Sequence, residues 1–501
     1  MKKTLFFISL LVFGFSITNA NTEDRVVLIP YPNQIEFSKG SFNLSFDTPI
    51  EINGVGDKTT INFLINQFKL PKNRSVDFKR SPSIILKIVK SEDLKSYEWY
   101  QLEISKKGVY VKANSSKGLL YAISTLNQIL FQTRKGGYYQ LPYLTIDDDP
   151  SYQFRGFMLD ASRHMQSVQT VKSILDFMVS IKLNVFHWHL TDDQGWRIES
   201  LKYPKLNIIG SYAIRSLDKE INGYYTIKDI HEILDYAQQR NIEVIPEFDV
   251  PGHSWSIMNT YPEYRCPHVP YSNAFCAGND KTLPFIKSLF DEIIEIFHPK
   301  YIHIGGDERE KDLWNTCPLC KKKMEELNIS DENELQNHFL NEVSKYLHAK
   351  NVITIAWAEN LEGGIPENQI TQSWRLKNEA TVAIKMGHQV IVSDNLECYL
   401  DYPENEKEKE SKPDWMPIMT TKKLYDFDFI PPNLTPEEAK LVLGGECPLW
   451  TEVISENQIY FQIKRRIEAH AERSWTKLEN KDLDRFMTSY QKLSAYFTNF
   501  F

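Results

Sequence analysis

Short apolar runs alternate with amphipathic stretches from Phe154 onward, and this alternation is the most regular pattern in the sequence. Short apolar runs are typical of buried strands, and apolar residues at a spacing of three and four are typical of helices. The predicted strands are Phe154–Asp160, Asn184–Leu190, Ile242–Phe248, Tyr301–Gly305, Val352–Trp357, Gln369–Trp374, Gln389–Ser393 and Leu441–Gly445. The clearest helices are Val168–Ile181, Ile227–Arg240, Leu283–Phe297 and Glu334–Leu347, and a last helix is expected over Glu456–Trp475. Eight successive strand–helix units predict an α/β fold, a closed (β/α)8 TIM barrel over residues 151–501.

A different pattern precedes this barrel, with fewer and shorter apolar runs in residues 21–150. The predicted strands here are Val26–Ile29, Ile84–Val89, Tyr100–Ser105 and Gly108–Ala113, followed by a helix from Ser115 to Leu130. These elements predict a small α+β domain. The acidic segment Asp147–Pro150 marks its expected boundary with the barrel.

Residues 1–20 have the pattern of a cleavable secretory signal. Lys2 and Lys3 precede the apolar run Leu5–Ile17, and Thr18–Ala20 offers small residues at the cleavage positions. This predicts export to the periplasm or the extracellular space, with an uncleaved anchor as the less favoured alternative. The run is too short for a comfortable membrane span, and no later stretch is apolar for long enough, so no span is expected after cleavage.

The composition is that of an ordinary globular protein, with 42% hydrophobic and 25% charged residues. It excludes a disordered or fibrous chain. Without Lys2 and Lys3, 56 basic residues face 66 acidic ones, which gives the mature chain a net charge of −10. An acidic chain with no basic block is a poor binder of nucleic acid, so no nucleic-acid partner is expected.

All six cysteines follow the predicted signal, in a compartment where disulfides are allowed. Cys317 and Cys320 form a lone CxxC, whereas a structural zinc site would require a second such pair. A small disulfide or two free thiols are therefore favoured over a metal. Cys266 and Cys276 bracket a short loop and are candidates for pairing. No metal or other cofactor is expected.

Chemically active side chains collect where the predicted strands end, which is the end of a TIM barrel that holds the active site. They comprise carboxylates, aromatic residues, one arginine and one histidine. The candidates are Arg163, Asp192, Asp249, His253, Asp307, Glu308, Trp357, Trp374, Tyr399, Asp401, Trp450 and Glu452. Chance would scatter such residues over both ends of the barrel, so they predict one shared cavity.

The most specific candidate is the acidic pair Asp307–Glu308, which follows two glycines at a strand end. Two close carboxylates repel each other, so one proton tends to stay bound near neutral pH. A protonated carboxyl group beside an ionised one is what cleavage of a glycosidic bond requires. Taken without its position, the pair would be an ordinary surface pair.

The tryptophans at the same rim suit a sugar, because flat indole rings pack against the C–H faces of a pyranose. Core packing is the alternative for each of Trp357, Trp374 and Trp450. Arg163 offers a planar fork of donors that suits vicinal hydroxyls, and a structural pair with Asp160 is its alternative.

His187 and His189 share one strand face and resemble a pair of metal ligands. A metal-dependent barrel hydrolase is therefore one alternative function. Both residues precede the strand end, however, so buried and hydrogen-bonded core histidines are the favoured interpretation.

An ordered set of motifs over residues 150 to 475 resembles the β-N-acetylhexosaminidases of glycoside hydrolase family 20. Residues 21–150 resemble the small domain that precedes the barrel in that family. The motifs that carry the resemblance are Arg155-Gly156, Asp160–His164, His187–Arg197, Pro246–His253, His303–Glu308, Trp374, Tyr399–Asp401 and Leu449–Glu452.

The resemblance implies that Glu308 is the general acid and later the base towards water. No protein nucleophile would be needed, because the 2-acetamido oxygen of the substrate attacks the anomeric carbon. Asp307 would orient the acetamido N–H and stabilise the oxazolinium-type intermediate, and Tyr399 would donate to the acetamido oxygen. Configuration would be retained.

The remaining residues would surround the substrate, with Trp357 as the loosest match. The implied substrate-binding residues are Arg163, Trp357, Trp374, Asp401, Trp450 and Glu452, and the supporting ones are Asp192, Asp249 and His253. The resemblance thus implies an exo-acting enzyme whose partner is a glycan with a terminal β-linked GlcNAc or GalNAc. A catalytically inactive glycan-binding barrel is a further alternative.

Overall fold

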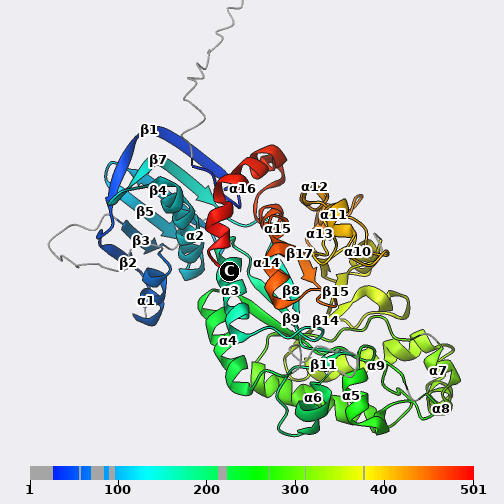
Figure 1. Cartoon of the computed structure of the whole chain (residues 1–501). Helices are drawn as coiled ribbons and strands as arrows, with labels where there is room; N and C mark the ends of the chain where they lie inside the picture. Colours follow the sequence, from blue (N-terminus) through cyan, green and yellow to red (C-terminus); the bar gives the residue numbers. More distant parts are fainter. Residues whose placement is uncertain are drawn as a thin grey trace, which may run out of the picture.

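The computed structural model describes residues 26–55, 58–68, 84–89, 96–212, 223–269, 271–310, 312–375 and 378–501. An N-terminal sheet domain lies beside a barrel domain (Figure 1). The predicted signal at residues 1–20 lies outside the described residues.

Eight parallel strands form the closed barrel, as predicted. Each strand pairs with the next, and the last pairs with the first. The strands are β8 (Phe154–Asp160), β9 (Val185–His189), β12 (Glu243–Glu247), β13 (Tyr301–His303), β14 (Ile353–Trp357), β15 (Gln369–Ser373), β16 (Val390–Val392) and β17 (Val442–Leu449). The expected helices are α3 (Val168–Ser180), α4 (Ile227–Gln239), α6 (Thr282–Phe297) and α9 (Glu332–His348).

Shorter elements occupy the connections between these strands and helices. After β9 the chain forms a small hairpin, β10 (Thr191–Asp192) and β11 (Gly195–Trp196). The short helices are α5 (Trp255–Thr260), α7 (Leu313–Thr316), α8 (Pro318–Leu327), α10 (Glu379–Lys385), α11 (Glu406–Lys409), α12 (Thr421–Asp426) and α13 (Pro436–Ala439).

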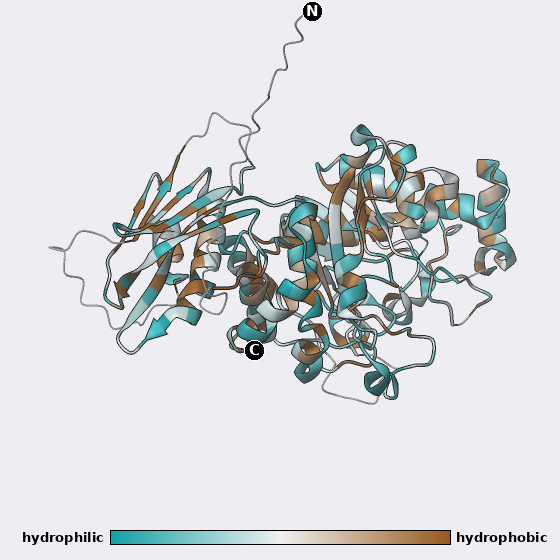
Figure 2. Cartoon of the chain, turned by 90° about the horizontal axis from the view of Figure 1, so that it is seen from above, coloured by the Kyte–Doolittle hydropathy of each residue, from teal (hydrophilic) through white to brown (hydrophobic). Residues whose placement is uncertain are grey.

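The N-terminal domain is a mixed seven-stranded sheet with helix α2 (Ser116–Thr133) packed against it. Its path runs β1-β7-β4-β5-β3-β2, with β6 attached to β7. The remaining elements are β1 (Gln34–Ser45), β2 (Ile50–Asn53), α1 (Lys58–Asn66), β3 (Ile84–Ile88), β4 (Tyr100–Ser105), β5 (Gly108–Ala113), β6 (Arg134–Lys135) and β7 (Tyr138–Asp148). Hydrophobic and hydrophilic residues alternate along these strands, as expected for a sheet with one buried face (Figure 2).

The prediction of a strand over Val26–Ile29 is wrong. The backbone N–H groups of Val27 and Ile29 donate to the side chains of Gln132 and Gln128 on helix α2, both at 2.9 Å. The segment therefore pairs with helix side chains and not with a strand. The sheet is completed by four strands that were not predicted, β1, β2, β6 and β7. Exposed and less exposed residues alternate along β1 and β7, so a search for apolar runs misses these two strands.

The expected helix over Glu456–Trp475 is interrupted. It consists of a short turn, α14 (Ile459–Ile463) and α15 (Arg466–Trp475), because Arg465 takes a left-handed backbone conformation with φ of 66°. A further helix, α16 (Leu483–Thr498), was not predicted. It lies between the two domains, where Tyr496 contacts Phe131 of α2 and Phe497 contacts Phe177 of α3 (Figure 1).

A buried ion pair joins the domains. The Asp148 carboxylate at the end of β7 accepts from Lys182 Nζ at 2.9 Å, from the Tyr100 hydroxyl at 2.7 Å and from Trp475 Nε1 at 3.0 Å. The side chains of Asp148 and Lys182 are 0% and 1% exposed. Charges buried this deeply are stable only when paired, so the ion pair fixes how the sheet domain sits on the barrel.

No helix among the described residues is both long and apolar enough to cross a membrane.

We expect Lys182→Met to lower the free energy of unfolding by about 3–5 kcal/mol, because it leaves the Asp148 charge buried without its cation. Lys440→Met is the matched control, since Lys440 forms an exposed pair with Glu437 at 2.8 Å. We expect that change to cost less than about 0.5 kcal/mol. Urea denaturation of both variants measures the difference, and equal losses would contradict the interpretation.

Candidate active site

A cavity of about 330 Å³ opens at the carboxyl ends of the barrel strands. This volume is at the low end for small-molecule sites. The residues that line it are Arg163, Asp192, Asp249, His253, Asp307, Glu308, Trp374, Tyr399, Asp401, Tyr402, Trp415, Trp450 and Glu452. The structure therefore brings together every candidate site residue except Trp357.

The turn after β13 directs two adjacent carboxylates into this cavity. Gly305 has a φ of 66°, and a Cβ atom there would lie 1.8 Å from the Asp249 carboxylate. The next amide, that of Gly306, donates to Asp249 Oδ1 at 3.1 Å. The turn that follows places Asp307 Oδ2 and Glu308 Oε2 each 3.6 Å from His253 Nε2. Only glycine fits at position 305, so this turn depends directly on the sequence.

The two carboxyl groups lie in unequal surroundings. The Asp307 side chain is 10% exposed and the Glu308 side chain is 58% exposed. Burial raises the pKa of Asp307 to about 6, with further contributions from the charges of Glu247 and Glu308. Its neighbour Asp249 has a pKa well above the usual range because of burial and the charge of Asp307.

Glu308 differs from the expectation for a general acid. The polar contact with His253 lowers the pKa of the Glu308 carboxyl, although partial burial opposes this. Within the pair the higher pKa therefore belongs to Asp307, the more buried member, and the retention of a proton by the pair near neutral pH stays a prediction. The reason is the histidine, which lies between Glu308 and the Asp192 anion.

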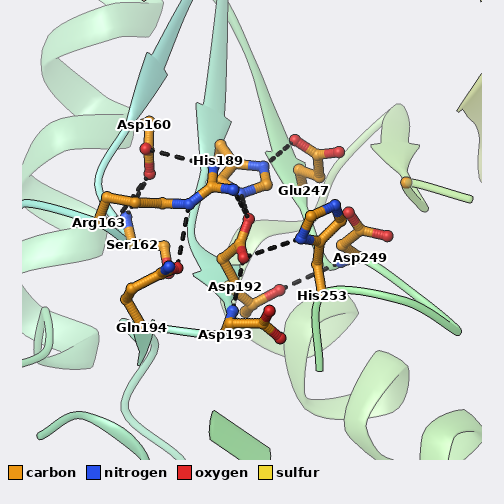
Figure 3. Close-up of polar contacts among 12 residues, drawn as sticks. Asp160, Ser162, Arg163, His189, Asp192, Asp193, Gln194, Glu247, Asp249 and His253 are labelled. Atoms are coloured by element: carbon orange, nitrogen blue, oxygen red, sulfur yellow. Dashed lines mark hydrogen bonds and ion pairs between the residues drawn. The ribbon is translucent and has the colours of Figure 1, made fainter. Parts of the chain in front are cut away.

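Asp192 organises the polar wall behind the pair (Figure 3). Its carboxylate contacts His253 Nδ1 at 3.1 Å, His189 Nε2 at 2.8 Å and an Arg163 terminal nitrogen at 2.9 Å. Despite burial, these cationic neighbours hold the pKa of Asp192 well below its usual range. The anion in turn raises the pKa of His253 well above its usual range. An imidazolium is thereby placed against Glu308.

Arg163 lies in the cavity wall, where it is held mainly by carboxylates. Its guanidinium is 3.4 Å from Asp160 as well as 2.9 Å from Asp192, and 3.8 Å from Glu452. It also stacks over the Trp450 ring at 5.0 Å. The structural pair with Asp160 is therefore present, and it orients the guanidinium at the edge of the cavity.

Aromatic rings form the opposite wall. Trp374 and Tyr399 are nearly parallel, with ring centroids 6.4 Å apart, and Trp450 lies 6.2 Å from Tyr399. Trp357 is 2% exposed and packs beneath this wall against Trp374 and Trp450. Its indole N–H donates to Glu247 at 3.1 Å. The structure thus places Trp357 under the cavity, as a support for the lining rings.

Polar groups without a protein partner face the same space. Asp401 Oδ1 and Trp374 Nε1 have no hydrogen-bond partner within the described part of the chain. Burial, followed by the charge of Glu452, raises the pKa of Asp401 well above its usual range. Burial likewise raises the pKa of the Tyr399 phenol well above its usual range, so the phenol stays a donor. Buried polar groups of this kind are satisfied by a polar ligand.

His187 and His189 lie below the cavity in a core of carboxylates. His187 Nδ1 is 2.9 Å from Glu446 and its Nε2 is 3.1 Å from Glu247, while His189 bonds Glu247 and Asp192. His187, Glu247 and His303 are close enough to share an ion, but they do not line the cavity. The favoured interpretation as hydrogen-bonded core histidines fits this arrangement better than a metal-dependent hydrolase.

Three residues near the site were missed from the sequence. Tyr402 and Trp415 line the cavity, and Glu359 accepts the backbone N–H of Glu308 at 3.0 Å. Burial and the charge of Asp307 raise the pKa of Glu359 to about 7. Glu359 and Tyr402 follow predicted strand ends, so a search for polar and aromatic side chains after each strand could have identified them. Trp415 lies in a polar connection with no periodic signal.

Comparison with known proteins agrees with this geometry. Residues 152–478 match the catalytic-domain model of glycosyl hydrolase family 20, and residues 26–149 match the model of domain 2 of that family. A beta-hexosaminidase of Porphyromonas gingivalis is 33% identical over 92% of this chain, which spans 62% of that relative. A beta-hexosaminidase of Akkermansia muciniphila is 30% identical over 89% of this chain and 91% of the relative.

Solved structures show the same architecture. The exo beta-N-acetylglucosaminidase of Vibrio harveyi in complex with N-acetylglucosamine superposes with a TM-score of 0.84 at 29% identity, covering 94% of this chain and 77% of that one. The beta-N-acetylhexosaminidase of Bacteroides fragilis gives a TM-score of 0.83 at 28% identity, with coverage of 95% and 96%. The chain is a glycoside hydrolase that belongs to glycosyl hydrolase family 20.

Proposed function

We propose that this protein is an exo-acting β-N-acetylhexosaminidase that releases a terminal β-linked GlcNAc or GalNAc with retention of configuration. The observation that carries the proposal is the pair Asp307–Glu308, two adjacent carboxyl groups of unequal burial that face one cavity with an aromatic wall. One carboxyl can stay ionised beside a developing positive charge while the other transfers a proton.

In the first step Glu308 donates its proton to the glycosidic oxygen, and the substrate's own acetamido oxygen attacks the anomeric carbon. Holding that oxygen within the same molecule as its target gives it a high effective concentration, which replaces a protein nucleophile. Asp307 accepts the acetamido N–H and stabilises the oxazolinium-type intermediate. Glu308 then removes a proton from the water that opens the intermediate.

Binding of the substrate raises the pKa of Glu308, which is lowered in the free enzyme. A sugar bound in the cavity covers a carboxylate that is 58% exposed without it. Removing water from a carboxylate raises its pKa. Binding therefore moves the proton affinity of Glu308 towards that of a general acid.

The walls of the cavity supply binding and orientation. The Tyr399 phenol donates to the acetamido oxygen, and the rings of Trp374 and Trp450 pack against the sugar and its methyl group. Asp401 and Glu452 accept from ring hydroxyls. The small volume, closed from below by Trp357, suits one terminal residue, which supports exo action.

We further propose that the chain is exported, on the strength of the signal pattern in residues 1–20. The family supports a glycan partner, and the acidic net charge argues against a nucleic-acid partner. The presence of both Asp307 and Glu308 argues against a non-catalytic glycan-binding barrel.

We expect Glu308→Gln to lower kcat on an aryl β-N-acetylglucosaminide by about 10²–10⁴-fold, because the amide cannot donate the proton. Glu310→Gln makes the same chemical change two positions away, on an exposed side chain, and should leave kcat unchanged. Steady-state kinetics with far-ultraviolet circular dichroism test both. Normal turnover in folded Glu308→Gln would refute the assignment.

Substrates without the 2-acetamido group should react very slowly. We expect kcat/KM for an aryl β-glucoside to be at least ~10³-fold below that for the matching N-acetylglucosaminide, because the internal nucleophile is missing. An aryl β-N-acetylgalactosaminide keeps the acetamido group and serves as the control. Comparable rates on the glucoside would mean that a protein group performs the attack.

The pH dependence of kcat/KM follows from the number of protons bound by Asp307 and Glu308 together. Activity needs one proton shared between Asp307 and Glu308, whichever group holds it in the free enzyme. Since the pKa of Asp307 is about 6, we expect kcat/KM to fall as the pH rises through that value. In Asp307→Asn the decline of the residual activity at high pH should shift to lower pH, because only Glu308 then titrates. An unchanged decline in this variant would contradict the scheme.

A further inference from the structure

Four buried cysteines meet beside the active site, between the loops that follow β12 and β13. Cys276 Sγ lies 3.8 Å from Cys317 Sγ and 3.7 Å from Cys320 Sγ, and Cys266 Sγ lies 4.0 Å from Cys320 Sγ. All four sulfur atoms lie within 4.8 Å of one another. Each side chain is fully buried.

These separations describe a tetrahedron rather than two bonded pairs. Zinc–sulfur bonds of ~2.3 Å place the sulfur atoms of a tetrahedral site ~3.8 Å apart. Two disulfides would instead give two separations near ~2.0 Å. Here Cys276 is about equally distant from two partners, and Cys320 also has two near neighbours.

The backbone around the sulfur atoms allows the two cysteine-bearing loops to approach each other closely. An antiparallel bridge pairs Arg265 with Phe275, the residues that directly precede Cys266 and Cys276, so the two cysteines flank one point of close backbone approach. The N–H of Gly278 donates to Cys320 Sγ at 3.3 Å, the kind of second contact that orients a thiolate ligand. A Cβ atom at Gly278 would lie 2.2 Å from the backbone of Leu319, so only glycine lets the two loops meet.

We propose that Cys266, Cys276, Cys317 and Cys320 bind one structural Zn²⁺. The expectation that the CxxC lacks a second pair is thereby revised. The second pair exists, but its members are ten positions apart and are brought together by the loop after β12. Four thiolates with no open position are typical of a structural zinc site and not of a catalytic one.

The position of the ion gives it a role in holding the catalytic turn. Asn273 lies between the first two cysteines in the sequence, and its side-chain amide donates to the carbonyl oxygen of Glu308 at 3.3 Å. The carbonyl oxygen of Asn273 accepts from Ser254, the residue after His253, at 2.9 Å. The metal would join the loop after β12 to the segment that follows Glu308. It would thereby hold His253 and the Glu308 carboxyl group at a fixed separation.

The test begins with the full-length protein, purified without a polyhistidine tag and without added reductant or chelator. Elemental analysis should find about one zinc per chain. A mercurial reagent should release that zinc while a chromogenic chelator records it. Replacement by Co²⁺ should produce the thiolate charge-transfer and visible bands of tetrahedral sulfur coordination.

Cys320→Ser should weaken Zn²⁺ binding by at least the ~10–100-fold that changes in supporting groups cause. Cys447→Ser removes a buried thiol on β17 outside the cluster and should keep its zinc. If Cys320→Ser fails to fold, the metal content and the Co²⁺ spectrum of the unaltered protein decide the question.

Two results would overturn the proposal. One is a metal-free chain in which peptide mapping finds these four cysteines in disulfides. The other is a chain with four reactive thiols that takes up no Zn²⁺ on addition of the metal alone.

Discussion

The chemistry of this protein depends on the contact between the buried carboxyl group of Asp249 and the backbone of Gly305 and Gly306. Asp249 occupies the space where a Cβ of Gly305 would be, and it accepts the N–H of Gly306. The contact forces the chain to turn sharply at the end of β13. Two residues later the turn separates the environments of Asp307 and Glu308, which adjacent positions on a regular strand would place on opposite faces. Every role proposed for the pair follows from that separation.

The second requirement is a polar layer beneath the cavity in which two buried anions each have several partners. Asp192 and Glu247 are anions surrounded by the imidazoles of His189, His253 and His303 and by the Arg163 guanidinium. Buried charges that are fully paired and hydrogen-bonded are rigid, and rigidity of the supporting groups keeps reacting groups in place. The catalytic groups at the surface of this layer are therefore positioned before the substrate arrives.

The barrel was predictable because its strands are buried on both faces, so each appears as an apolar run. Exposure alternates along the sheet strands β1 and β7, so a search for apolar runs misses them. The site residues were found because they follow the carboxyl ends of the predicted strands, where the active site of a TIM barrel lies. What the sequence alone could not reveal depends on three-dimensional surroundings. Examples are the location of the shared proton, the burial of Trp357 and the meeting of Cys266 and Cys276 with a distant CxxC.

The contact between Asp148 and Trp475 has a consequence for biosynthesis. The two residues are separated by 327 positions, with the whole barrel between them. A ribosome that has completed the sheet domain must add all of those residues before the indole donor exists. The other partners of the carboxylate, Tyr100 and Lys182, are synthesised much earlier, so the Trp475 contact is the last part of this junction to become available. Contacts of such high sequence separation slow folding, and this one can form only after the last strand of the barrel has been synthesised.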